Sequence, residues 1–89
     1  MPLGHLSPKF IDDYWKVVAD VLENVFRARK AQDLRELRNE IDALPADEQQ
    51  YFFHAEPLDV AADLAGAGDK DLSQYVGDYE TIATRHHWW

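Results

Sequence analysis

The chain has 89 residues, the length of one domain, and it contains no cysteine, which excludes disulfide bridges, thiolate nucleophiles and cysteine-based metal sites. Its formal net charge of −8 argues against direct binding to nucleic acid or to an anionic membrane surface. The sequence shows neither a secretory signal nor an apolar run of about 18 residues. We therefore expect a single domain over residues 1–89, in the cytoplasm and without a membrane span.

The charge is unevenly distributed along the chain. Residues 1–44 carry seven Lys/Arg against eight Asp/Glu, whereas residues 45–89 carry two against nine. We interpret the one basic cluster as a solvated surface with cations near helix C-termini, because the overall charge would repel phosphate. The cluster consists of Arg27, Arg29, Lys30, Arg35 and Arg38.

The first predicted helix starts at Ser7 and Pro8, since serine is a good N-cap and proline fits the first helical position. Apolar residues then recur at helical spacing and form a broad face, which places this helix at the centre of the core. They are Ile11, Tyr14, Trp15, Val18, Val21, Leu22 and Val25.

A second apolar stripe is half a turn out of phase with the first, because nine residues separate Val25 from Leu34. This phase shift predicts a break between Arg27 and Asp33, followed by a helix that Asp33 and Glu36 begin as a capping box. The alternative is one long helix over residues 8–44 whose two faces serve two contacts. The second stripe consists of Leu34, Leu37, Ile41 and Leu44.

Two short helices are predicted next. Pro45 opens one of them, and Pro57 both ends it and opens the other. Three consecutive aromatic residues occupy positions 51–53 and cannot all face one way, so we expect Phe53 to face solvent or a partner. The second of these helices should turn Leu58, Ala61, Leu64 and Ala65 inward.

The last apolar stripe predicts a helix capped by Asp71 that contains Gly77, with a short strand over residues 79–84 as the alternative. Its members are Leu72, Tyr75, Val76, Tyr79, Ile82 and Ala83. The sequence thus predicts an all-α fold, a compact bundle of four to five short helices. The expected core residues are Trp15, Val18, Leu22, Leu37, Ile41, Leu64 and Ile82.

No motif in the sequence predicts a catalytic residue, a cofactor site or a metal site. Glu56, Asp59 and Asp63 share one face of the fourth helix, and with His54 they could offer ligands to a divalent cation. We favour a solvated acidic face, because metal sites in helical bundles usually combine carboxylates from several helices.

Trp88 and Trp89 are two large apolar side chains at the end of the sequence, where polar residues are usual. They either cover the small core or bind a partner.

By elimination, we expect a small acidic protein–protein interaction module, such as an adaptor, an inhibitor or an immunity/antitoxin-like factor, that binds a protein partner or homodimerises. One alternative is an acidic nucleic-acid mimic that blocks a basic groove on another protein. The other is a metal-binding protein or an enzyme. We expect no catalysis and no cofactor. The candidate contact residues are Phe53, Glu56, Asp59, Asp63, Trp88 and Trp89.

Overall fold

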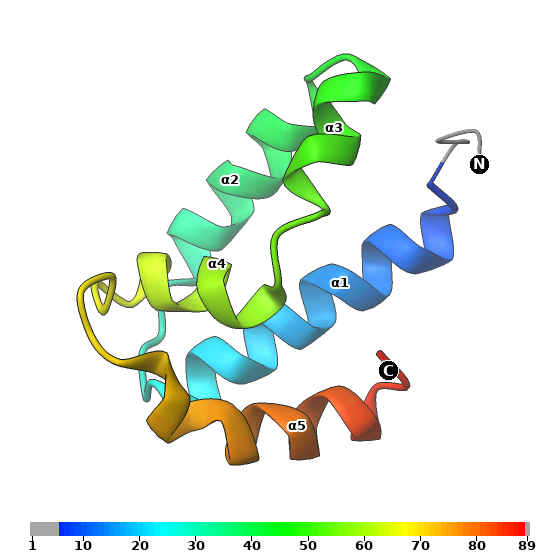
Figure 1. Ribbon diagram of the computed structural model, residues 1–89. Helices are drawn as coiled ribbons and strands as arrows, with labels where there is room; N and C mark the ends of the chain where they lie inside the picture. The colour runs from blue at the N-terminus through cyan, green and yellow to red at the C-terminus, as the bar shows by residue number, and fades with distance from the viewer. Residues whose placement is uncertain (1–5, 89) are drawn as a thin grey trace.

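Five α-helices make up the computed structural model, which describes residues 6–88 (Figure 1). No strand occurs in this part of the chain, so the predicted all-α class is confirmed. A π-helical turn, Val21–Val25, continues the first helix, and a 3-10 turn, Leu72–Tyr75, precedes the last one. The helices are α1 (Pro8–Asp20), α2 (Ala31–Asp42), α3 (Ala46–Phe52), α4 (Pro57–Leu64) and α5 (Val76–Arg85).

α1 occupies the centre of the fold. It contacts α2, α4 and α5, and the π-helical turn contacts both α4 and α5. In Figure 1, α5 runs along one side of α1, whereas α2 and α4 lie on the other side. The predicted start is confirmed, because the Ser7 side chain accepts a hydrogen bond from the Phe10 backbone N–H and Pro8 occupies the first turn. Tyr14 and Val18 are fully buried, as a central helix requires.

The predicted break after α1 is confirmed, and the alternative of one long helix over residues 8–44 is wrong. The π-helical turn ends in a hydrogen bond from the Phe26 N–H to the Val21 carbonyl, and Arg27 then adopts a left-handed φ of 56°. The predicted capping box is wrong, because α2 begins at Ala31, two residues before Asp33, without a side-chain cap. A non-glycine residue thus reverses the chain direction at a position where the sequence carries no turn signal.

The prediction that Phe53 faces outward is wrong. α3 ends at Phe52, and Phe53 lies in the turn that follows, where its side chain is only 7% exposed. The outward-facing aromatic is Tyr51, at 79% exposure. Phe53 keeps a helical φ of −74° and donates its N–H to the Gln49 carbonyl, so its side chain still follows helical spacing. The adjacent Phe52 and Phe53 both pack inward, which leaves Tyr51 as the aromatic that faces solvent.

The C-terminal half follows the predicted order of elements. Pro57 opens α4, and Leu58 and Ala61 on this helix are buried. The Asp71 carboxylate accepts a hydrogen bond from the Ser73 N–H and so caps the 3-10 turn. α5 is continuous through Gly77, which excludes the strand alternative over residues 79–84.

Most of the predicted core is buried, namely Trp15, Val18, Leu22, Ile41 and Ile82. We also expected Leu37 and Leu64 in the core, but both are only half-buried and pack at its edge. Leu37 is less buried than expected because Ile41 is the one residue of α2 that is buried. α2 therefore rests on the rest of the bundle through a narrow contact.

The different burial of two leucines gives a stability test. Leu22→Ala should lower the free energy of unfolding by about 2–5 kcal/mol, because it empties a site in the core. Leu37→Ala should cost about 1 kcal/mol, because that side chain is already half in water. Urea unfolding followed by circular dichroism measures both values. A loss below about 0.5 kcal/mol for Leu22→Ala would contradict the central position of α1.

Candidate protein-binding groove

Two adjoining hollows lie between α1 and α2 and are open to solvent. Their volumes are about 290 Å³ and about 330 Å³, and Ala19, Ala31 and Leu34 line both of them. We call the combined surface the α1–α2 groove. Its floor is apolar and is completed by Trp15, Leu22 and Ala28. Ala19, Ala28 and Ala31 contribute to the hollows, because their side chains are too short to fill the space between two helices.

Cations surround this apolar floor. Two of them are already paired: Arg38 with Asp12 at 2.6 Å, and Arg29 with Glu23 at 3.6 Å. Lys30 and Arg35 form no ion pair within residues 6–88. The cations that line the groove are Lys16, Arg29, Lys30, Arg35 and Arg38, and Glu23 is the one acidic lining residue.

The basic cluster found in the sequence therefore has a place in the fold that its spacing did not reveal. Neither α1 nor α2 has a basic residue in its last turn, so these cations do not stabilise helix C-termini as expected. Arg27 does not line the groove, because it lies in a separate polar hollow beside Asp78 and Arg85. The other four cluster residues border the α1–α2 groove.

Trp15 lines one of the two hollows and also belongs to the buried core. The side chain is 3% exposed, and its ring stacks on Phe52 at a centroid distance of 5.5 Å. Its Nε1–H is buried and has no acceptor within residues 6–88. Buried donors are nearly always satisfied in proteins, so this N–H is an exception within the core.

The chain is strained at one end of the groove. The π-helical turn and the left-handed Arg27 lie directly before Ala28, Arg29 and Lys30, which form that end. π-turns and left-handed non-glycine residues are often found at functional sites, because a folded chain keeps such conformations only where the surroundings enforce them.

The predicted acidic contact residues lie away from the groove. Glu56, Asp59 and Asp63 are exposed at or on α4, and His54 is exposed in the turn before it. Within residues 6–88, no group of three His, Asp or Glu side chains is arranged to hold a metal ion.

Trp88 covers part of the core. Its ring lies 5.1 Å from Phe10 and 5.2 Å from Tyr14, measured between centroids, and the side chain is half-buried. Its backbone N–H donates to the Ala83 carbonyl at 2.7 Å. Trp89 lies outside the described residues. Trp88 is therefore packed against α1, and a partner contact of its exposed edge stays a prediction.

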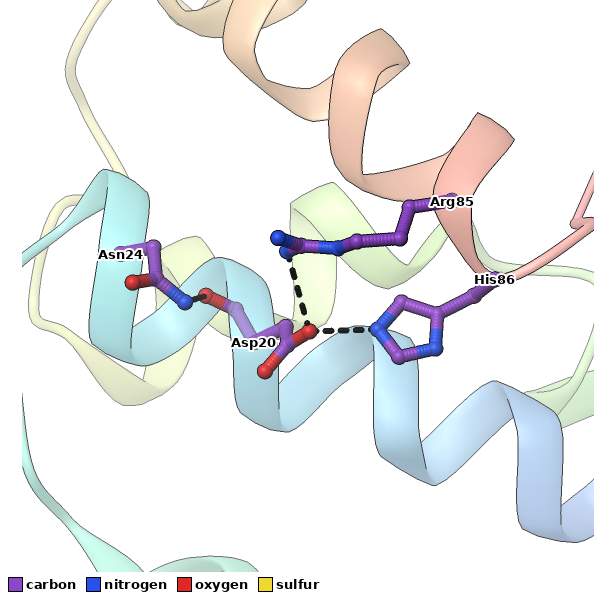
Figure 2. Close-up of polar contacts among 4 residues, drawn as sticks. All are labelled: Asp20, Asn24, Arg85 and His86. Carbon is purple, nitrogen blue, oxygen red and sulfur yellow. Dashed lines mark hydrogen bonds and ion pairs between the residues drawn. The ribbon is translucent and has the colours of Figure 1, made fainter.

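Asp20 holds the C-terminal end of α5 against α1 (Figure 2). Its carboxylate accepts from Arg85 at 3.2 Å and from the His86 Nε2–H, while its backbone carbonyl accepts from the Asn24 amide at 3.0 Å. The two partners are 65 and 66 residues away in sequence, so no local pattern could predict this contact.

No protein family, curated protein or solved structure matches this chain. Within the described residues, no helix combines the length and the apolar character that crossing a membrane requires. The proposed function therefore rests on the side chains that line the α1–α2 groove.

Removing the Asp20 carboxylate tests how firmly α5 is held. Asp20→Asn should lower the free energy of unfolding by about 1 kcal/mol, because it removes the charge that the exposed Arg85 and the partly buried His86 share. Asp13→Asn is the matched control and should cost less, because its partner Lys9 is 84% exposed. Urea unfolding of both variants gives the comparison, and equal losses would contradict the anchoring role of Asp20.

Two buried tyrosines predict the alkaline limit of stability. Burial raises the pKa of Tyr14, and burial together with Glu56 and Asp59 raises the pKa of Tyr79 to about 12. Above about pH 10 the unfolded chain releases tyrosine protons that the folded chain retains. The free energy of unfolding should therefore fall, by on the order of 1–3 kcal/mol between pH 9 and pH 12. Urea unfolding of the wild type and of Tyr79→Phe measures it, and identical slopes against pH would contradict the assignment.

Proposed function

We propose that this chain is a protein-binding module whose α1–α2 groove takes an acidic amphipathic helix of a partner protein. The observation that carries the proposal is the combination of an apolar floor with unpaired cations on a chain whose net charge is −8. A cationic rim that served only solubility would not need to border these two apolar hollows.

The shape of the groove favours a helix as the ligand. α1 with its π-helical turn forms one wall, and α2 with the three residues before it forms the other. The hollows adjoin through three shared residues, Ala19, Ala31 and Leu34. A third helix that lies along such a groove inserts apolar side chains at i, i+3 or i+4 and i+7. Two neighbouring hollows can then receive side chains from successive turns of the ligand.

The charges of the groove favour an acidic ligand. Lys16, Lys30 and Arg35 project from its two sides without a strong partner of their own, so carboxylates that flank the apolar stripe of the ligand can pair with them. Such rim pairs mainly speed association and select the partner, and their effect weakens as salt increases. The burial of apolar side chains in the floor supplies most of the affinity.

A peptide pair tests the proposal. One peptide of about 18 residues carries leucine at helical spacing with flanking glutamate, and the other carries lysine in place of glutamate. Fluorescence anisotropy should show that the acidic peptide binds, and Arg35→Glu should weaken this binding at least about fivefold. The matched control Lys70→Glu makes the same charge change on an exposed residue away from the groove and should change the affinity less than about twofold.

The negative net charge of the protein works against the expected result, so binding of the acidic peptide would be informative. A chain of −8 without a specific site attracts the basic peptide and repels the acidic one. If the acidic peptide does not bind, or if Arg35→Glu and Lys70→Glu weaken it equally, the groove is not the binding site and the proposal is wrong.

A further inference from the structure

α3 presents a surface that has the properties expected of a ligand for the groove. Tyr51 is the most exposed large apolar side chain in the described residues, at 79%. Asp47 and Glu48 lie four and three residues before it, so they share its face of the helix, and both are exposed. We call these three residues the α3 knob. An aromatic side chain flanked by two carboxylates complements an apolar floor flanked by cations.

The charge pattern of the whole chain supports this match. Residues 39–69 contain eight Asp/Glu and no Lys/Arg, whereas residues 15–38 contain six Lys/Arg and four Asp/Glu. The segment that forms the groove is therefore net positive, and the segment that carries the knob is strongly negative. The chain contains both halves of a complementary pair.

The knob of a given molecule does not fill the groove of the same molecule. Phe52 stacks on Trp15 and Phe53 lies edge-on to Tyr14, so these two residues fix α3 against its own core. Tyr51 consequently points to solvent, and the groove stays open. The complementary surfaces can meet only between two molecules.

We propose that the α1–α2 groove also binds the α3 knob of a second copy of this chain. In this contact Tyr51 enters the apolar floor, and Asp47 and Glu48 face Lys30 and Arg35. The inference rests on the proposed function, since it takes the groove to be a site for acidic apolar helices. It adds that self-association and partner binding compete for one surface, so the free chain is partly self-inhibited.

Sedimentation equilibrium at low salt tests self-association. The weight-average mass of the wild type should rise at least about 1.5-fold above the monomer mass at about 1 mM protein, the value for a dimer with a Kd of about 1 mM. Tyr51→Ser should abolish the rise. Its side chain is 79% exposed, so the variant keeps the fold, which circular dichroism verifies.

Mixing two charge-reversed variants identifies the contact. One variant carries Lys30→Glu with Arg35→Glu, and the other carries Asp47→Lys with Glu48→Lys. Each variant alone brings like charges together and should remain monomeric, whereas an equimolar mixture offers opposite charges at every knob and groove and should associate. The control variant, Lys9→Glu with Lys70→Glu, makes the same total charge change outside the groove and should associate through the wild-type contact.

Three results would overturn the inference: a wild type that stays monomeric at about 1 mM, a Tyr51→Ser variant that still associates, or a mixture that stays monomeric. A failure here is distinguishable from a failure of the proposed function. A monomeric wild type that binds the acidic peptide in an Arg35-dependent way leaves the groove as a site for other proteins only.

Discussion

The burial of Tyr14 is the interaction on which the rest of the fold depends. Its side chain is fully buried, its ring contacts those of Trp15, Phe52, Phe53 and Trp88, and its hydroxyl donates to the Ala55 carbonyl at 3.1 Å. One residue of α1 thereby joins α3, the turn before α4 and the segment after α5. In a domain of this size such a cluster supplies a large part of the apolar burial, and the hydrogen bond fixes the turn at Ala55 in one arrangement.

The same cluster explains why a groove persists beside it. The aromatic side chains gather where α1 meets α3 and the C-terminal segment, and α2 contributes none of them. α2 is held by Ile41, by partly buried leucines and by the Arg38–Asp12 ion pair. Short alanine side chains keep the contact between α1 and α2 thin, so a thinly packed surface also carries unpaired cations. A weakly filled contact leaves apolar surface that a ligand can cover.

The sequence predicted the helices well, because apolar spacing and proline positions are local signals, as at Pro8 and Pro57. It failed where the outcome depends on a turn or on distant residues. Phe53 was assigned to the wrong side because spacing alone does not say which of three consecutive aromatic residues faces the core. Asp33 was wrongly assigned as a cap because the turn at Arg27 contains no glycine and α2 begins two residues earlier, at Ala31. The groove was not predicted, since alanines carry no signal of what they face. The basic cluster was visible, but its position beside an apolar floor was not.

The π-helical turn has a consequence for how this chain tolerates changes in length. A π-turn places one extra residue in a helix and closes a hydrogen bond over five residues, as the Phe26 N–H does with the Val21 carbonyl. Deleting one residue there would restore ordinary α-helical pairing and rotate the residues that follow within this helix by about 100°. Phe26 would then leave its position beside Tyr75, and the chain would enter the turn at Arg27 from another direction. The end of the groove formed by Ala28, Arg29 and Lys30 thus depends on the length of the chain before it.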